Sequence, residues 1–291
     1  MSPGSRSAAE KPGGATPKIS ILTVVRDGAP TLRRAIESVV RQLDPRFEYI
    51  VIDGASTDGS REIIKDYESR LAMWVSEPDR GIYDAMNKAL AAARGEWAIF
   101  LGSDDELLTG LDAAARAMTD RQAVYYGDVE IAGSGRISGG RFNRYKLMQR
   151  NICHQAIFYP RAIYRAKPYD TKAGMLADYK YNIELWGQGT RFEYLPRVIS
   201  RFDNRGRSSG DQSYFEPIKM AAIRDSFGPI LHSVKRARTA AAEIVRGRQR
   251  FRKTQPEKAQ GEPVDRRHPR GDAEIGSARG SARGEAARGL M

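Results

Sequence analysis

Cysteine and histidine are scarce in this sequence. Cys153 is the only cysteine, and the three histidines lie far apart, at positions 154, 232 and 268. A single cysteine excludes an internal disulfide and a zinc site made of several cysteines, so nothing in the sequence requires an oxidising compartment. The scattered histidines also give little support to zinc binding. We therefore expect a cytoplasmic protein.

Long apolar runs are missing as well. The longest run, Ile19–Val25, contains Ser20 and Thr23 and is far shorter than the roughly 18 residues of a membrane-spanning helix. The beginning of the chain has no apolar segment of the kind found in signal peptides. Hydrophobic residues make up 41% of the 291 residues and charged residues 29%, with a mean hydropathy of −0.55. This composition excludes a multi-span membrane protein and a collagen-like chain, and it indicates a soluble globular protein.

Three common enzyme signatures do not occur. A phosphate-binding loop of the form Gly-x-x-x-x-Gly-Lys-Ser/Thr is absent, which removes the simplest nucleotide triphosphatases. The glycines at positions 133, 135, 139 and 140 lack the dinucleotide-binding spacing and lie in a predicted hairpin, so a dehydrogenase is disfavoured. Gly-x-Ser-x-Gly is also absent, which argues against a serine hydrolase built on a nucleophile elbow.

Basic residues outnumber acidic residues, and most of the excess positive charge lies near the end of the chain. The net charge is +12, and residues 232–291 hold 15 basic and 7 acidic residues. Their composition predicts a disordered basic tail at residues 254–291, and residues 1–17 look similar. A basic tail also suggests nucleic-acid binding. Because residues 232–291 contain a single aromatic residue, Phe251, and because no nucleic-acid module is recognisable, we expect no nucleic-acid partner.

Residues 211–253 are predicted to form a helical, basic region. Its apolar residues precede a cluster of lysines and arginines, a pattern typical of segments that dock on an anionic membrane surface. We therefore expect peripheral association with the inner face of the membrane. The alternative is a terminal helix packed on the domain and followed by a solvated tail. The apolar residues concerned are Ile218, Ala222, Phe227, Ile230 and Leu231.

Residues 18–210 show the pattern of one α/β domain. In the first half, short apolar runs alternate with amphipathic ones, which predicts βαβ units and a mainly parallel sheet. The expected strands are 19–25, 49–53, 71–75 and 97–101, and the expected helices are 31–41, 57–69 (capped by Ser56 or Thr57) and 83–93. The second half predicts a smaller mixed or antiparallel sub-sheet of strands 123–131, 137–141, 154–159, 192–195 and 197–202, with one helix at 175–186.

Aspartates follow the predicted strands of the first half. Asp27, Asp53, Asp79 and Asp104 each fall at or just after a strand end, where open parallel sheets bind ligands. The pair Asp104 and Asp105 offers hard oxygen ligands for Mg²⁺ or Mn²⁺. Taken singly, each acid also suits a turn or a helix cap. Four acids at one edge repel each other, however, and therefore imply a metal or a basic partner.

Six sequence blocks, in order, resemble family 2 glycosyltransferases of the GT-A fold. The similarity covers residues 18–210 and looks closest to bacterial enzymes that build exopolysaccharides or glycolipids. It implies a GT-A fold with a Rossmann-like nucleotide-binding half, a mixed central sheet and a smaller acceptor-side sub-sheet. The blocks are 19–27, Tyr49-Ile-Val-Ile-Asp-Gly-Ala-Ser-Thr-Asp-Gly-Ser60, Ser76-Glu-Pro-Asp-Arg-Gly-Ile-Tyr-Asp-Ala-Met-Asn87, Phe100-Leu-Gly-Ser-Asp-Asp105, Tyr126-Gly-Asp128 with Asn151-Ile-Cys-His-Gln-Ala-Ile-Phe-Tyr159, and Ala177-Asp-Tyr179.

The resemblance also implies roles for donor-binding residues. Asp53 matches the acid that reads the nucleotide base, and Thr23 and Asp27 lie near the base and ribose. Asp79 belongs to the block that faces the ribose and the sugar. Asp104 and Asp105 match the acid motif that holds a divalent cation, Mn²⁺ or Mg²⁺, on the donor diphosphate. Many relatives carry a further acid where this chain has Gly102, so the motif leaves open which of the two aspartates binds the metal.

On the acceptor side, Asp178 matches the acid taken as catalytic base. Without the resemblance, Asp178 would be interpreted as an acidic residue in the first turn of a helix. If Asp178 were not the base, Asp128 or Glu184 would be the next candidate for that role. His154 is expected either to bind the diphosphate or acceptor or to be a satisfied, partly buried histidine. The loop with Arg205 and Arg207 is either a lid over the donor or an ordinary solvated turn.

Together these features predict an inverting hexosyltransferase. It would move a sugar from a nucleotide-diphosphate-sugar donor to a saccharide or lipid-linked acceptor, with a divalent cation on the diphosphate. One alternative is a sugar nucleotidyltransferase, although residues 26–30 are a poor version of the glycine-rich basic loop that such an enzyme needs. The other is a non-enzymatic nucleic-acid-binding protein acting through its basic tail.

Overall fold

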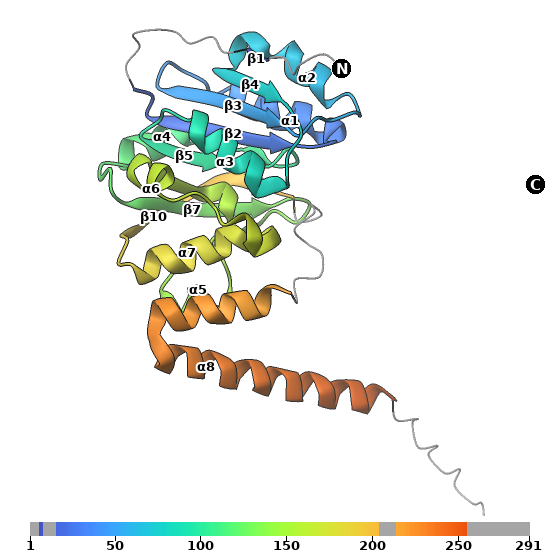
Figure 1. Cartoon of the computed structure of the whole chain (residues 1–291), viewed down its shortest axis with the longest axis vertical. Coiled ribbons are helices and arrows are strands. Elements are labelled where there is room, and N and C mark those ends of the chain that lie inside the picture. The colour runs from blue at the N-terminus through green and yellow to red at the C-terminus, as the bar shows by residue number, and fades with distance from the viewer. Residues whose placement is uncertain (1–5, 8–15, 204–213, 255–291) are drawn as a thin grey trace, which may run out of the picture. The chain divides into compact units, whose positions relative to one another are not determined.

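The computed structural model describes residues 6–7, 16–203 and 214–254, and for residues 242–254 it describes the backbone alone (Figure 1). The chain divides into two units, residues 1–242 and residues 243–291. Most of the predicted terminal tails, residues 1–17 and 254–291, lie outside the described residues, as does the predicted loop with Arg205 and Arg207. In the described residues, no helix is long and apolar enough to cross a membrane.

A mixed ten-stranded sheet runs through the first unit (Figure 1). Four parallel strands form its first half, in the order β4 (Met73–Ser76), β3 (Phe47–Asp53), β2 (Ile19–Val25) and β5 (Trp97–Phe100). The two-residue strand β1 (Arg6–Ser7) pairs antiparallel with β4. The carboxyl ends of the four parallel strands therefore meet at one edge of the sheet.

The second half of the sheet joins the first through an antiparallel strand, β9 (Ile157–Pro160), which pairs with both β5 and β7 (Val124–Ile131). Strand β7 also pairs antiparallel with β8 (Arg136–Ser138) and parallel with β10 (Phe192–Phe202). The short strand β6 (Glu106–Leu107) completes the edge against β10. This mixed α/β architecture agrees with the predicted fold class, in which a smaller sub-sheet extends a parallel half.

Helices cover both faces of the sheet because its strands alternate their apolar side chains. Leu22 points into one hydrophobic core, and Ile21 points into the other. The core around Ile21 packs against α1 (Ala29–Val40), α2 (Ser60–Asp66) and α4 (Leu111–Ala117). The core around Leu22 packs against α3 (Ile82–Ala92), α5 (Arg144–Gln149), α6 (Arg161–Ala166), α7 (Ala177–Gly187) and the beginning of α8 (Phe215–Thr254). Short 3-10 turns lie at Glu68–Arg70 (η1), His154–Ala156 (η2) and Thr171–Leu176 (η3).

The predicted elements of the first half are confirmed to within a few residues, but several predictions about helices are wrong. The expected cap of α2 is replaced by Gly59 in a left-handed conformation (φ 97°). Ser56 and Thr57 cannot cap the helix because they bind Asp53 and Asp27. The second half contains α5 and α6 besides the expected helix. Each has only six residues, too few to show a helical period in the sequence.

A buried polar cluster ties β2, β3 and the end of α3 together. Glu48 is 4% exposed, and its carboxylate accepts a hydrogen bond from the Ser20 hydroxyl (2.6 Å) and another from the Arg94 guanidinium (3.0 Å). Because a buried carboxylate is stable only when it is paired, this cluster fixes the register of the two central strands.

We expect Glu48→Ala to lower the free energy of unfolding by about 1–3 kcal/mol, because the buried Ser20 hydroxyl loses its acceptor. Urea denaturation followed by circular dichroism measures the change. The matched control is Glu62→Ala on the exposed side of α2, which should alter stability by less than about 0.5 kcal/mol. Equal effects of the two variants would contradict the role assigned to the cluster.

Candidate active site

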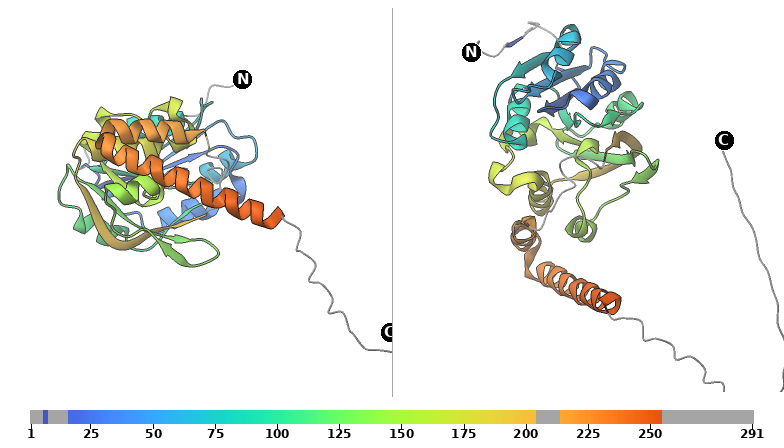
Figure 2. Two further views of the ribbon diagram at one scale, coloured as in Figure 1. Left: turned by 90° about the horizontal axis from the view of Figure 1, so that it is seen from below. Right: turned by 90° about the vertical axis from the view of Figure 1, so that its right-hand side faces the viewer.

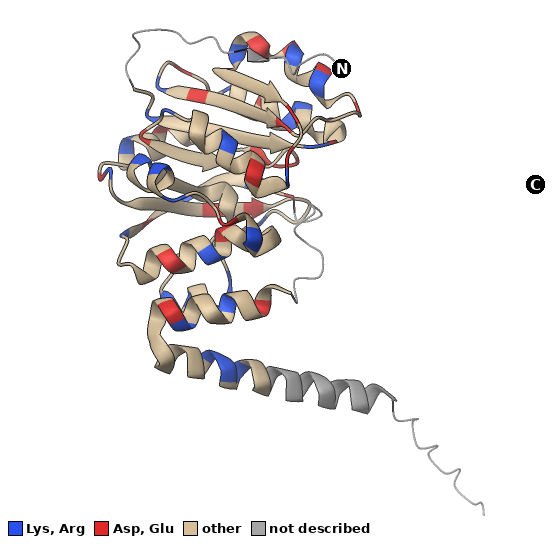
Figure 3. Cartoon of the chain, viewed as in Figure 1, with Lys and Arg blue, Asp and Glu red and all other residues tan. Residues whose placement is uncertain are grey.

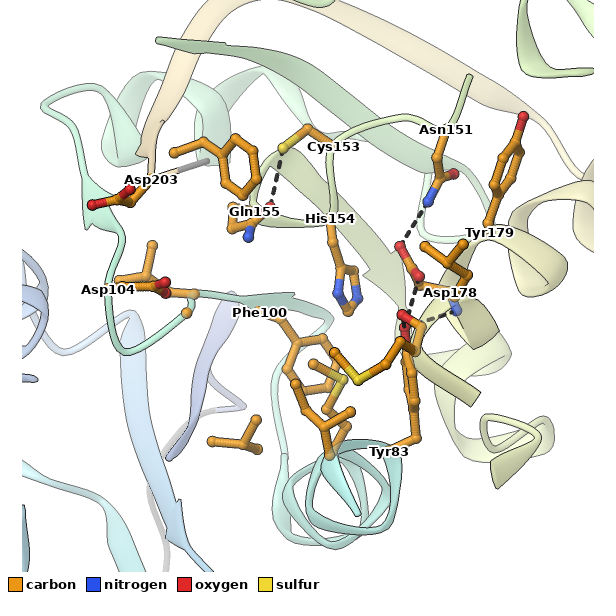
Figure 4. A pocket seen from close by; sticks show the side chains of 18 of the residues that line it. Tyr83, Phe100, Asp104, Asn151, Cys153, His154, Gln155, Asp178, Tyr179 and Asp203 are labelled. Carbon is orange, nitrogen blue, oxygen red and sulfur yellow. Dashed lines mark hydrogen bonds between the residues drawn. The ribbon is translucent and has the colours of Figure 1, made fainter. Parts of the chain in front are cut away.

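A cavity of about 1230 Å³ opens at the carboxyl ends of β2 and β5 and reaches the second half of the domain (Figure 4). Its lining brings together five residues predicted from the sequence. They are Asp27, Asp79, Asp104 and His154 from the predicted donor-binding set and Asp178, the predicted base, and Asp203 joins them although it was not predicted. In the described part of the chain, no three His, Cys, Asp or Glu residues are grouped so that they alone could hold a metal ion.

Asp104 and Asp203 form the acidic wall of the cavity (Figure 4). Asp104 follows β5, and Asp203 follows β10, the strand that comes last in the described sheet. Burial raises the pKa of Asp104, and the nearby negative charge of Asp203 raises it further. Two carboxylates held together in this way attract a cation. With two hard oxygen ligands from the protein and the rest from a ligand or water, the site fits Mg²⁺ or Mn²⁺.

Asp105 is turned away from this wall. Its side chain is 1% exposed, and it accepts hydrogen bonds from the backbone N–H groups of Asp203 (2.9 Å) and Gly102 (3.2 Å). Burial raises the pKa of Asp105 to about 7, with a smaller contribution from the charge of Asp104. The two predicted metal ligands therefore differ in environment, because Asp104 faces the cavity while Asp105 holds the loops after β5 and β10 together.

Gly102 makes this arrangement sterically possible. A Cβ atom at position 102 would lie 2.8 Å from the Asp104 Oδ1 atom and closer still to the Asp105 carboxylate. No side chain fits there without moving one of the two acids. The departure from the family pattern at Gly102 is thus coupled to the inward position of Asp105.

Asp27 belongs to a strained loop after β2. It has a left-handed conformation (φ 53°), and its Oδ1 atom accepts a hydrogen bond from the Thr57 N–H (2.9 Å). In return, the N–H of Asp27 donates to the Ser56 hydroxyl (2.8 Å). The loops after β2 and β3 are locked together at the rim of the cavity.

The predicted residues Thr23 and Asp53 are fully buried and are not part of the cavity lining. The Asp53 carboxylate accepts hydrogen bonds from the Ser56 hydroxyl and from the Ser76 hydroxyl (2.6 Å). Thr23 shares a hydrogen bond with the Tyr49 hydroxyl (3.0 Å). Their roles at the nucleotide base remain predictions, and a base reaching Asp53 would have to displace Ser56.

Asp79 forms an ion pair within the protein. Its carboxylate lies 2.8 Å from the Lys88 ammonium on α3. Asp27, Asp53 and Asp79 therefore each have a hydrogen-bond donor within the protein. The sequence had suggested that all four strand-end acids need a metal or a basic partner, and three of them already have partners. The mutual repulsion of four strand-end acids is relieved locally at three of them, and Asp104, opposite Asp203, is where an external cation is expected.

Asp178 lies on the opposite side of the cavity, in the first turn of α7 (Figure 4). The Tyr83 hydroxyl donates to one carboxylate oxygen (2.7 Å), and the Asn151 amide donates to the other (2.6 Å). Behind Asn151, the Asn182 amide donates to its oxygen (2.9 Å), and the Tyr159 hydroxyl donates to Asn182 (2.8 Å). This chain fixes the orientation of the carboxylate that faces the cavity.

His154 lies between the two walls on η2 rather than in the strand predicted for it. Its Nε2 atom is 2.9 Å from the Tyr169 hydroxyl, and its ring packs on Phe100 with centroids 4.9 Å apart. Burial lowers the pKa of His154. The ring is therefore neutral at physiological pH and can offer a ligand a hydrogen bond or a surface, but not a fixed positive charge.

Sequence reasoning missed Tyr83, Asn151 and Asp203 as site residues. Asp203 directly follows a strand, and the same rule that found Asp27 and Asp104 would have found it. Tyr83 and Asn151 stand inside recognised sequence blocks, but only the fold brings them to Asp178, 95 and 27 positions away.

Comparisons with known proteins identify the family and the fold. The family model "Glycosyl transferase family 2" matches residues 20–175. A PGL/p-HBAD biosynthesis glycosyltransferase of Mycobacterium bovis is 31% identical over 221 residues, which cover 71% of this chain and 86% of that protein. Among solved structures, Staphylococcus aureus TarS (residues 1–349) in complex with UDP-GlcNAc superposes with a TM-score of 0.59 at 18% identity, over 75% of this chain and 69% of TarS. A mannosyltransferase from Pyrobaculum calidifontis in complex with GDP-Man and Mn²⁺ has a TM-score of 0.50 at 18% identity, over 77% of this chain and 65% of its own.

We expect Gly102→Ala to destabilise the protein by about 1–3 kcal/mol, because the added methyl group overlaps the two carboxylates that follow it. The neighbouring Ser103→Ala removes a hydroxyl from the same loop and should leave stability nearly unchanged. Thermal unfolding of both variants measures the difference. A Gly102→Ala protein that is as stable as the parent would show that the loop has room for a side chain.

Proposed function

The chain belongs to glycosyltransferase family 2, and we propose that it transfers a sugar from a nucleoside-diphosphate donor to a saccharide or lipid-linked acceptor with inversion at the anomeric carbon. One observation carries this proposal. Asp104 and Asp178 line the same cavity from opposite sides, one near the nucleotide-binding half and the other on the acceptor-side half. An inverting transfer needs this separation, with the leaving diphosphate on one side of the sugar and the base on the other.

On the donor side, Asp104 and Asp203 are proposed to hold a divalent cation. When bound, such a cation stabilises the negative charge that develops on the departing diphosphate. The TM-score of 0.50 to a mannosyltransferase solved with GDP-Man and Mn²⁺ supports a nucleotide-sugar site of this kind. Arg26, next to Asp27 in the cavity lining, is proposed to contact the phosphates.

Nucleotide recognition is proposed for the rim between β2 and β3. Asp27 and Asp79 are accessible from the cavity and can accept hydrogen bonds from ribose hydroxyls. Asp53 is proposed to read the base, with Thr23 beneath it, once Ser56 turns aside. TarS has been solved with UDP-GlcNAc, which supports a nucleotide diphosphate in a fold of this type.

On the acceptor side, Asp178 is proposed to be the base. The acceptor hydroxyl loses its proton to the Asp178 carboxylate as its oxygen bonds to the anomeric carbon. The bond between that carbon and the diphosphate oxygen breaks, and the nucleoside diphosphate leaves with the electron pair. Tyr83 and Asn151 hold the carboxylate in one orientation through their hydrogen bonds, which keeps a lone pair directed into the cavity. His154 is proposed to contact the diphosphate or the acceptor as a neutral hydrogen-bonding group.

Other functions have less support. A sugar nucleotidyltransferase would need a glycine-rich basic loop after β2, and the loop there is instead the strained turn of Asp27 bound to Thr57. A nucleic-acid-binding role is not suggested by the family match or by the solved structures. Both comparisons favour the glycosyltransferase.

The cation site is tested by nucleotide binding. We expect Asp104→Asn and Asp203→Asn each to weaken Mn²⁺-dependent binding of a nucleoside diphosphate at least about 10-fold, since each removes one charged ligand. Isothermal titration with and without chelator measures this. Asp66→Asn, an exposed substitution on α2, is the control and should bind as the parent does.

Asp105→Asn distinguishes the two acids of the motif. It should have a smaller effect on Mn²⁺-dependent binding than Asp104→Asn, because the Asp105 carboxylate points away from the cavity. A larger loss in Asp105→Asn would show that Asp105 turns outward and binds the metal. If all three variants bind the nucleoside diphosphate as the parent does, the proposed metal site is wrong.

The base is tested by turnover. Asp178→Asn keeps the size of the side chain but removes its basicity, so we expect kcat to fall by about 10²- to 10⁴-fold with little change in donor affinity. Glu184→Gln on the same helix is the control, because its carboxylate pairs with Lys167 and Lys180 outside the cavity lining. Near-parental turnover in Asp178→Asn, or an NMR spectrum showing retained configuration, would show that Asp178 is not the base of an inverting transfer.

A further inference from the structure

A long stretch of the sequence lacks acidic residues. Residues 132–169 contain eight basic residues and no Asp or Glu, and residues 226–242 contain three basic residues and no Asp or Glu. The first stretch includes α5, and the second includes the part of α8 that follows its kink at Gly228 (φ 83°) (Figure 2). Both stretches belong to the first unit of the chain, residues 1–242.

The fold brings these two acid-free segments together. The Arg238 guanidinium lies 5.2 Å from the centroid of the Tyr145 ring, and the Lys235 ammonium lies 3.4 Å from the Gln149 side-chain oxygen. Figure 3 shows basic but no acidic residues on the coloured part of α8 beyond its kink. We define the α5/α8 face by its six exposed residues, Arg141, Arg144, Tyr145, Ile230, Val234 and Arg238.

The arginines of the α5/α8 face have no carboxylate partner among the described residues. Elsewhere on the surface, exposed basic side chains such as Arg33 and Arg191 form ion pairs with neighbouring acids. Unpaired charges of one sign on one surface favour an anionic partner.

The same face carries exposed apolar side chains. Ile230 is 78% exposed and Val234 is 41% exposed, and with Arg238 they form one row at i, i+4 and i+8. The other apolar residues that the sequence suggested for membrane contact are used differently. Ala222 is buried, and Ile218, Phe227 and Leu231 pack against the core of the domain.

We propose that the α5/α8 face docks on an anionic lipid bilayer, with Ile230 and Val234 entering the interface and the arginines contacting lipid phosphates. Apolar contact combined with basic residues is the pattern of helices that lie on such membranes. Arg150 and Gln149, at the end of α5, also line the cavity. If the proposed transferase function holds, docking brings a lipid-linked acceptor to the cavity rim.

Two other partners fit less well. Nucleic acid would use the arginines but would leave Ile230 and Val234 exposed, because phosphate contacts gain nothing from aliphatic side chains. A second copy of this chain would bring like-charged faces together, because two-fold packing puts the same patch on both subunits. An anionic lipid surface can contact both the arginines and the apolar side chains of the face.

The experiment is co-sedimentation of the full-length, donor-free protein with vesicles of phosphatidylcholine alone or mixed with phosphatidylglycerol. We expect binding only to the anionic vesicles, and weaker binding at high salt. The charge variant is Arg141→Gln/Arg144→Gln/Arg238→Gln, and the apolar variant is Ile230→Ser/Val234→Ser. The control Arg41→Gln/Arg116→Gln/Arg121→Gln removes the same charge from exposed arginines outside the face.

The charge variant should lose about 100-fold in vesicle affinity, since each basic residue near an anionic surface contributes about a factor of 5. The apolar variant should bind more weakly than the parent, and the control should keep most of its affinity. Thermal unfolding checks that all variants fold. Equal losses in the charge variant and the control would overturn the proposal, because a general charge effect or the basic tail would then be responsible.

Two further results would also overturn it. One is binding to a nucleic-acid duplex together with no binding to anionic vesicles, and the other is a dimer in solution that the apolar variant disrupts, again without vesicle binding. None of these measurements involves sugar transfer. Failure of the docking proposal is therefore distinguishable from failure of the proposed function, which the Asp178→Asn turnover experiment tests.

Discussion

The site depends on one topological constraint, which is that β4, β3, β2 and β5 run parallel and end at the same edge of the sheet. The loops after these strands must share that edge, and they carry Asp27, Asp53, Asp79 and Asp104. Collecting so many carboxylates costs free energy unless each has a partner. Hydroxyls and N–H groups satisfy Asp27 and Asp53, and Lys88 satisfies Asp79. Asp104 faces a second acid instead, which is why a cation is expected there.

The second half of the sheet is attached to this edge by hydrogen bonds that meet at Asp178. Tyr83 comes from α3, which packs on the first half, whereas Asn151 precedes η2 in the second half. A carboxylate buried between two such donors is held in one place, and it also holds the donors together. The proposed base is thus a structural junction as well, so its substitution by Asn, which keeps the size of the side chain and one acceptor oxygen, is a better probe than its removal.

Charge is divided between two surfaces of the same domain. The cavity gathers carboxylates and suits a cation, while the α5/α8 face gathers arginines and suits anions. The two surfaces meet at Arg150 and Gln149. Such a division agrees with the proposed transfer from a nucleotide-sugar and with the proposed docking on a lipid surface.

The sequence by itself determined the family, the parallel half of the sheet and the acids at its strand ends. These features are local, because apolar runs, turns and the residues that follow them lie within a few positions of each other. Strand Ile19–Val25 agrees with its prediction at both ends. Only the tertiary structure decided which acids face the cavity, because that depends on contacts between distant residues. The Asp105 carboxylate binds the backbone of Asp203, 98 positions away, and the Tyr83 hydroxyl binds Asp178, 95 positions away. Ile218 and Leu231 pack against the core, whereas Ile230 stays exposed. Side-chain orientation and the pairing of buried polar groups are set by packing, and a local sequence pattern does not contain them.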